Sequence, residues 1–235
     1  MICIYPQHGN RITVEEAYGT PETTDRTGND QGGIRPSTAL CMVTSLDGSI
    51  ALSGASGGLS SATDRGVLAQ LRRLADVIVV GAGTVRDEGY GPPKKHGQRI
   101  GVVTRRGDVN LASALFTSGA GFLIMPNDAP PTAVDAVRAG EGQVDLLSAL
   151  RSLPGNPSRV QIEGGASLNG AFLAADLIDE INLTVSPHLV GGSGPRLSLG
   201  APEMKTRFQL AQLCEHESYL FARYQRRYTA AANGD

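Results

Sequence analysis

The chain has 235 residues, of which 40% are hydrophobic and 19% are charged, and its formal net charge is −2 at pH 7. This length and apolar content indicate a folded chain with a sizeable core and exclude intrinsic disorder. The balanced charge gives no bulk attraction for nucleic acid or an anionic membrane, so a small-molecule partner is expected. No apolar run approaches the roughly 18 residues that span a bilayer, and the N-terminus has no secretory-signal pattern, so we expect a cytoplasmic protein.

Residues 1–36 are rich in Gly, Thr, Asp and Pro, above all between Tyr18 and Pro36, and this composition predicts an irregular N-terminal arm. The small polar residues of 229–235 predict a frayed tail. No repeat or low-complexity linker divides the rest, so we expect a single domain over residues 37–228. The three cysteines lack metal-ligand spacing and are expected to be free thiols.

Strand and helix patterns alternate along the predicted domain. The apolar residues of 64–75, beginning with Val67, recur at helical spacing, and Thr63 or Asp64 can cap this helix. A run of β-branched residues at 76–80 is typical of a strand buried on both faces. The remaining strands are expected at 38–45, 100–104, 121–125, 159–163 and 180–186, and the remaining helices at 131–139, 146–153 and 167–177.

The alternation of strands and helices predicts an α/β fold with three layers, in which helices cover both faces of a mostly parallel sheet. Segments 208–211 and 219–224 flank a polar turn and predict a C-terminal antiparallel hairpin. The sheet is therefore expected to be mixed, with an antiparallel edge.

Gly81-Ala-Gly-Thr84 follows the strand at 76–80, and its small residues would let backbone N–H groups approach a phosphate. In open α/β sheets, ligands bind at this end of the strands. The pattern misses the third glycine of the Gly-x-Gly-x-x-Gly fingerprint, because that position is Arg86. A tight turn without a ligand therefore remains an alternative.

A second glycine turn, Glu163-Gly-Gly-Ala-Ser167, joins the strand at 159–163 to a helix. The free N–H groups and the dipole of that helix favour an anion at its start. Glu163 would repel an anion, so its carboxylate is expected to accept hydrogen bonds from a ribose, an amide or an amine; alternatively, it is a solvated residue. Two such turns can hold one pyrophosphate from two sides, which favours a pyridine-nucleotide cofactor.

Two further candidates also follow strand ends. Asp47, in Ser45-Leu-Asp-Gly48, could orient a polar substrate or relay a proton, although Asp-Gly is equally a common turn. Arg105 and Arg106 could bind a 2′-phosphate and so select NADP over NAD, or be simply solvated. The zinc-deaminase, Gly-x-Ser-x-Gly and P-loop motifs are missing, which excludes those classes, and no metal site is expected.

Four motifs occur in one order along the chain: Met42-Val-Thr-Ser-Leu-Asp-Gly48, Ala75-Asp-Val-Ile-Val-Val-Gly-Ala-Gly-Thr84, Val103-Thr-Arg105 and Ile162-Glu-Gly-Gly-Ala-Ser-Leu168. Together they resemble the reductase domain of riboflavin biosynthesis, the 5-amino-6-(5-phosphoribosylamino)uracil reductase family, which has a dihydrofolate-reductase-like fold. The resemblance covers about residues 38–226.

The resemblance implies NADPH as the hydride donor to C1′ of a ring-opened ribosylaminopyrimidine 5′-phosphate. It implies that Asp47 and Glu163 lie near the substrate ribose and the nicotinamide, as catalytic or positioning residues. Ser60 and Ser61 are expected on the substrate side, and the family suggests a homodimer. The residues implied for the cofactor are Gly81, Ala82, Gly83, Thr84, Thr104, Arg105, Gly164, Gly165, Ala166 and Ser167.

The chain departs from the family pattern on the substrate side. Ser49 stands where Lys or Arg usually follows Asp-Gly, the substrate-loop Trp is absent near Gly58, and Arg86-Asp-Glu-Gly-Tyr90 replaces Asp-x-Pro-x-Leu. The usual deaminase domain is missing, so a stand-alone reductase is expected. Two alternatives stay open: a divergent reductase of a pterin-like substrate such as dihydrofolate, and a non-catalytic nucleotide-binding module.

Overall fold

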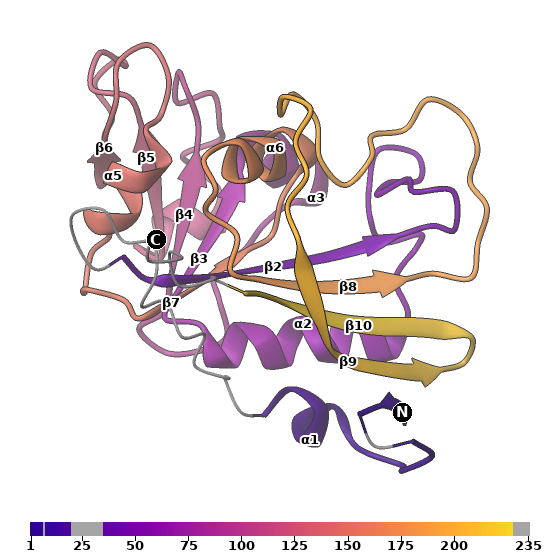
Figure 1. Ribbon diagram of the computed structural model, residues 1–235. Coiled ribbons are helices and arrows are strands. Elements are labelled where there is room, and N and C mark those ends of the chain that lie inside the picture. Colours follow the sequence, from indigo (N-terminus) through magenta and orange to yellow (C-terminus); the bar gives the residue numbers. More distant parts are fainter. Residues whose placement is uncertain (7, 20–34, 228–235) are drawn as a thin grey trace, which may run out of the picture.

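A ten-stranded mixed sheet forms the centre of the structure, a computed structural model that describes residues 1–6, 8–19 and 35–227 (Figure 1). The strand order is β1-β9-β10-β8-β2-β7-β3-β4-β5-β6. Six of the nine pairings are parallel, and the three that join β1, β9, β10 and β8 are antiparallel. This arrangement confirms the predicted mostly parallel, mixed sheet. The predicted tail 229–235 and residues 20–34 of the predicted arm lie outside the described residues.

The elements match most of the predicted segments to within a few residues. The strands are β1 (Ile2–Tyr5), β2 (Ser37–Thr44), β3 (Val77–Gly81), β4 (Arg99–Val103), β5 (Gly121–Met125), β6 (Ala136–Arg138), β7 (Arg159–Ile162), β8 (Glu180–Val185), β9 (Phe208–His216) and β10 (Tyr219–Arg226). The helices are α1 (Val14–Tyr18), α2 (Ala62–Leu74), α3 (Ala82–Glu88), α4 (Ala114–Thr117), α5 (Leu146–Arg151) and α6 (Ala166–Ala174).

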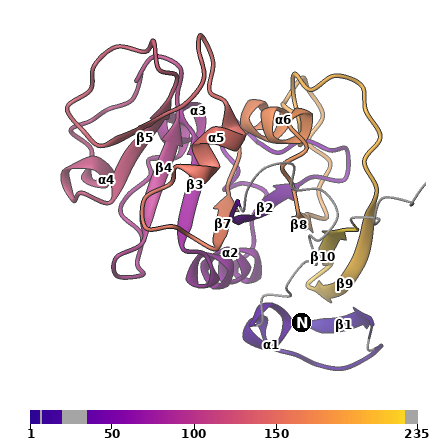
Figure 2. The ribbon, with the colours of Figure 1, turned by 60° about the vertical axis from the view of Figure 1, so that its left-hand side comes forward.

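Helices cover both faces of the sheet, as the views of Figures 1 and 2 show. On one face α5 and α6 pack on alternate residues of the central strands, such as Val79 and Ile162. On the other face α2 buries Val67 and Leu71 against β2 and β10, and α1 packs beside α2. The apolar stripe of α2 thus produces the three-layer architecture that its periodicity predicts. The three cysteines of the chain are free.

The parallel strands bring their carboxyl ends to one edge of the sheet. Val79 of β3 is opposite Ile162 of β7, and Gly81 at the end of β3 is opposite Val103 of β4. Val77 to Val80 are at most 4% exposed, which explains the unbroken β-branched run in this strand. Because α3 and α6 begin directly after β3 and β7, the two glycine segments meet at this edge.

Three local predictions are wrong. Residues 131–139 do not form a helix, because 136–138 form β6 and bond to β5 through backbone groups, for example Ala139 N–H to the Met125 carbonyl. The arm is not irregular where β1 pairs with β9 and α1 forms, so β1, and not the β9–β10 hairpin, is the antiparallel edge. Ser61, and not Thr63 or Asp64, caps α2, since its hydroxyl accepts from the Asp64 N–H at 3.1 Å.

Candidate functional site

A cavity of about 1100 Å³ opens where the carboxyl ends of β2, β3, β4 and β7 meet. Its walls also include residues of α2, α3 and α6, the loop 50–60, and two residues of the loop between β8 and β9, Pro195 and Leu199. Ligand pockets commonly measure roughly 300–1000 Å³, so this one is large enough for an extended ligand or for two adjacent ligands.

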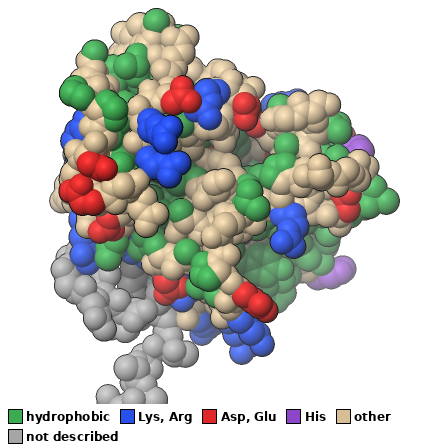
Figure 3. Space-filling view, turned by 90° about the horizontal axis from the view of Figure 1, so that it is seen from above, with side chains coloured by type: hydrophobic (Ala, Val, Ile, Leu, Met, Phe, Trp, Pro, Cys, Tyr) green, Lys and Arg blue, Asp and Glu red, His purple; other side chains and the backbone are tan. Residues whose placement is uncertain are grey.

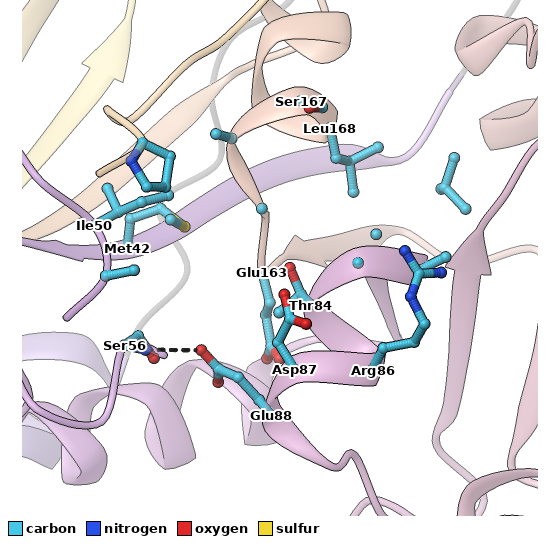
Figure 4. A pocket seen from close by; sticks show the side chains of 18 of the residues that line it. Met42, Ile50, Ser56, Thr84, Arg86, Asp87, Glu88, Glu163, Ser167 and Leu168 are labelled. Atoms are coloured by element: carbon cyan, nitrogen blue, oxygen red, sulfur yellow. Dashed lines mark hydrogen bonds between the residues drawn. The ribbon is translucent and has the colours of Figure 1, made fainter. Parts of the chain in front are cut away.

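The first helical turns of α3 and α6 lie side by side at this cavity (Figures 1 and 4). The N–H of Gly81 donates to the carbonyl of Gly164 at 2.6 Å, which ties the two strand ends together. Neither N-cap, Gly81 or Gly165, has a side-chain hydrogen bond to the turn that follows. The first N–H groups of α6 are therefore available to an anion. The predicted loop Gly81–Thr84 is instead the last residue of β3 followed by the start of α3.

Two glycines just before α6 lie close to other parts of the chain, Gly165 to α3 and Gly164 to β2. A Cβ on Gly165 would lie 2.9 Å from Thr84 Oγ1, and a Cβ on Gly164 would lie 2.9 Å from Met42 Sδ. Gly164 also has a φ of +78°, and the peptide that joins it to Gly165 is cis. A side chain at either position would therefore collide with its neighbour unless that neighbour moved.

Glu163 lines the cavity just before these glycines, and its side chain is only 3% exposed. Arg72 of α2 binds both carboxylate oxygens, with Nε 2.7 Å from Oε1 and Nη2 2.6 Å from Oε2. Burial alone would lower the pKa of Arg72, but the Glu163 carboxylate outweighs burial and raises it. The site therefore holds Glu163 as a hydrogen-bond acceptor in a two-pronged ion pair.

The loop after β4 supplies basic side chains at the other end of the cavity. Arg105 and Arg106 both line the cavity and are both exposed, whereas Thr104 is buried and accepts from the Gly107 N–H at 3.1 Å. Lys and Arg side chains gather on part of the surface seen from above in Figure 3. Exposed cations such as these suit a phosphate group that stays close to solvent.

Asp47 does not line the cavity. Its carboxylate accepts from the Ser45 hydroxyl at 2.5 Å and from the N–H groups of Gly191 at 2.7 Å and Val190 at 3.2 Å. These three donors, the Ser45 hydroxyl foremost, hold the pKa of Asp47 at about 2. The carboxylate thus stabilises the turn at 190–191. The predicted catalytic role of Asp47 stays a prediction, because Asp47 is not among the residues that line the cavity.

The other predicted residues divide in the same way. Ser60 lines the cavity and donates to Asp64 at 2.6 Å. Ser61, the N-cap of α2, and Gly164 are not among the lining residues. The cavity brings together eleven of the predicted residues, namely Ser60, Gly81, Ala82, Gly83, Thr84, Thr104, Arg105, Glu163, Gly165, Ala166 and Ser167.

The contacts of several lining residues are not evident from the sequence. Ser56 in the loop 50–60 donates its N–H to Glu88 of α3 at 3.1 Å, which joins two parts of the cavity wall (Figure 4). Tyr90 donates its hydroxyl to Glu163, and Arg65 of α2 is exposed at the same end of the cavity. Each lies on a helix or loop where it has an ordinary surface pattern, so only the fold shows that it faces the cavity.

Two classes of feature are missing from the part of the chain that the structure describes. No group of three or more His, Cys, Asp or Glu side chains is placed to hold a metal ion there. None of the described helices has the length and apolar character that crossing a membrane requires.

Comparison with known sequences identifies relatives of this chain. It is 28% identical over 182 residues to the 2,5-diamino-6-ribosylamino-4(3H)-pyrimidinone 5′-phosphate reductase of Methanothermobacter thermautotrophicus, covering 69% of this chain and 83% of that protein. It is 30% identical over 161 residues to the riboflavin biosynthesis protein RibD of Mycobacterium tuberculosis, covering 63% of this chain. That match spans only 41% of the RibD protein.

Solved structures show the same fold. A pyrimidine reductase-like protein from Corynebacterium diphtheriae superposes with a TM-score of 0.76 at 25% identity, over 91% of this chain and 98% of that one. The riboflavin biosynthesis reductase Rib7 of Saccharomyces cerevisiae gives a TM-score of 0.67 at 19% identity, over 90% and 96% of the two chains. The family model of the RibD C-terminal domain matches residues 36–220, which contain both glycine segments, Glu163 and its partner Arg72. This chain therefore belongs to the RibD C-terminal domain family.

Proposed function

We propose that this protein is an NADPH-dependent reductase that transfers a hydride to C1′ of a ribosylaminopyrimidine 5′-phosphate in riboflavin biosynthesis. The observation that carries the proposal is the cavity itself, in which a glycine-lined wall adjoins the Arg72–Glu163 ion pair. The named activity of the archaeal relative, a reductase of a ribosylaminopyrimidinone 5′-phosphate, supports the choice of substrate.

NADPH fits the glycine-lined wall. Gly165 leaves open a space that a Cβ would fill against Thr84, and the first N–H groups of α6 border that space. We assign the pyrophosphate to this wall and the 2′-phosphate to Arg105, with Thr104 shaping the loop. NADPH would supply the hydride, and the protein would orient it and exclude water.

The substrate would then occupy the end of the cavity near α2. Glu163 can accept a hydrogen bond from a ribose hydroxyl, and its ion pair with Arg72 suits this role better than that of a proton donor. The side chain of Arg65 lines this end, forms no ion pair with the described residues and is available to a 5′-phosphate. Binding at both ends would place the ribose between Glu163 and the nicotinamide.

The test is NADPH oxidation by the purified protein with the ribosylaminopyrimidine 5′-phosphate, in its uracil and diaminopyrimidinone forms, beside dihydrofolate. Turnover of either pyrimidine, with dihydrofolate slower by at least about 100-fold, is expected, because Arg65 and Glu163 would bind the phosphate and the ribose, which dihydrofolate lacks. Binding of NADPH without oxidation in the presence of any of the three would instead identify a nucleotide-binding module.

A second candidate is a divergent reductase of a pterin-like substrate. The observation that favours it is Tyr90, which replaces the family motif and contacts Glu163 inside the cavity. Preferential turnover of dihydrofolate would establish this alternative. We further propose a homodimer built from one reductase domain per chain, which light scattering of the purified protein tests.

A further inference from the structure

Tyr90 reaches Glu163 because of how α3 ends. Gly89, the C-cap of α3, has a φ of +64° and turns the chain back towards the sheet. The hydroxyl of Tyr90 then donates to Glu163 Oε2 at 2.7 Å, and the guanidinium of Arg72 lies over its ring, 5.4 Å from the centroid. The three side chains come from the loop after α3, from α2 and from the end of β7, and each contacts the other two.

The hydrogen bonds are shared unequally between the two carboxylate oxygens. Among the described residues, Oε2 accepts from Arg72 Nη2 and from Tyr90, whereas Oε1 accepts only from Arg72 Nε. A carboxylate oxygen has two lone pairs in its plane, so Oε2 is saturated and Oε1 keeps one position. Glu163 lines the cavity and therefore has a single acceptor position left for a ligand.

We propose that Tyr90 is a positioning residue, which fixes the Glu163 carboxylate so that Oε1 alone accepts one O–H or N–H donor of the substrate. Tyr90 does not react; it acts through Glu163. The identity of the donor, a ribose hydroxyl, rests on the proposed function. The restriction of Glu163 to one donor rests only on the contacts of Tyr90 and Arg72.

The protonation state of Tyr90 agrees with this role. Burial raises the pKa of its phenol, and the charge of Glu163 raises it further. The phenol consequently stays protonated and keeps donating to Glu163 throughout the neutral pH range. A group that must give up its proton in each turnover would need the opposite shift.

The experiment compares Tyr90→Phe with Tyr224→Phe in the full chain. Tyr224, on β10, is similarly half-buried, does not line the cavity, and its hydroxyl forms no hydrogen bond with the described residues. Two quantities are measured: the ¹³C resonance of the Glu163 carboxyl, identified by its loss in Glu163→Gln, and the steady-state constants for the pyrimidine substrate. NADPH affinity and the thermal midpoint of each variant serve as folding controls.

Tyr90→Phe is expected to shift the Glu163 carboxyl resonance and to raise the KM for the pyrimidine by about 5- to 20-fold, the effect of one charge-assisted hydrogen bond. Because the contact is made with bound substrate and transition state alike, kcat should change by less than about threefold. Tyr224→Phe should change neither quantity. If Tyr90 only supported the fold, Tyr90→Phe would not raise KM while leaving kcat nearly unchanged.

Two results would overturn the proposal. One is a Glu163 resonance that does not move in Tyr90→Phe, and the other is a resonance that moves while KM stays at the wild-type value. If wild-type protein fails to reduce the pyrimidine, the proposed function falls, and the carboxyl resonance still decides whether Tyr90 positions Glu163.

Discussion

The two ends of the cavity are lined by different kinds of chemical group. Where α3 and α6 begin, the wall consists of backbone and small residues, and the Gly81 N–H bonds to the carbonyl of Gly164, directly before Gly165. The end near α2 consists of longer side chains, above all Glu163, which is held by hydrogen bonds from Arg72. The first end has a shape that is set by main-chain geometry, and the second depends on side chains that are brought together from distant parts of the chain.

This difference has a functional meaning. A wall of backbone N–H groups can bind a phosphate whatever is attached to that phosphate, which suits a common cofactor. A cluster of side chains can be altered by single substitutions, which suits an end that distinguishes substrates. The departures from the family pattern at Tyr90 and Gly58 lie on that side-chain end or in the loop beside it.

The largest effect is expected from a substitution that disrupts only the end near α2. Glu163→Gln removes the charge that pairs with Arg72 and should lower kcat/KM for the pyrimidine by about 100-fold, because it leaves a partly buried cation unpaired. NADPH affinity should stay within about twofold, since the glycine wall is untouched. Kinetics and NADPH titration measure the two effects, with the exposed Glu203→Gln as the matched control. A parallel loss of NADPH binding would show that the two ends are not separable.

A second substitution breaks the backbone end. Gly165→Ala places a Cβ 2.9 Å from Thr84 Oγ1, in the space assigned to the pyrophosphate, and should weaken NADPH binding by about 30-fold. Titration of NADPH fluorescence measures it. The control is Gly66→Ala in α2, where a Cβ would meet only Val14 Cγ2 at an ordinary 3.7 Å. Unchanged NADPH affinity in Gly165→Ala would move the cofactor away from this wall.

A third substitution tests which coenzyme the glycine-lined end prefers, at the exposed Arg105. Arg105→Ala should weaken NADPH binding by about tenfold while NADH binding stays the same, because one charge-assisted contact to the 2′-phosphate is lost. Lys94→Ala, at an exposed position that does not line the cavity, is the control. An equal loss for both coenzymes would disprove the assignment of Arg105 to the 2′-phosphate.

The smallest expected effect concerns Asp47, which belongs to neither end. Asp47→Asn should lower kcat by less than about threefold, whereas removal of a proton-transfer residue usually costs at least about 100-fold. Since the folded pKa of about 2 lies below the ordinary 3.8, the carboxylate stabilises the fold above pH 3.8 and loses that contribution as the pH falls towards 2. The difference in thermal midpoint between wild type and Asp47→Asn should therefore shrink over this range. A constant difference would contradict the role of Asp47 at the 190–191 turn.

Elements that depend on local sequence patterns could be predicted, whereas elements that depend on a partner distant in the sequence could not. The run Val77–Val80 and the apolar stripe that contains Val67 are local patterns, and both predict the observed β3 and α2. β6 forms because its backbone bonds to β5, a partner that no pattern within 131–139 specifies. The start of α3 at Ala82 is likewise not predictable from the sequence, because no capping side chain marks it.

The site shows the same division. Both glycine segments and Glu163 are recognisable because glycine and a lone carboxylate at strand ends are distinctive locally. The partnership of Arg72 with Glu163 joins residues 91 positions apart, and Tyr90 reaches them only because Gly89 turns the chain. The contacts of Asp47 could not be predicted for the converse reason, since its position in a turn does not indicate which loop its carboxylate will bind.

The bond between Gly81 N–H and the Gly164 carbonyl would link the proposed binding of NADPH to folding. Each half of the glycine wall belongs to a different strand-helix unit, so the wall exists only after β3 and β7 have paired. A ligand that recognises the completed wall binds the native state and not the unfolded chain. At 100 times its dissociation constant, such a ligand would add about 2.7 kcal/mol to the free energy of unfolding. The thermal midpoint should then rise with NADPH concentration even where no reaction takes place.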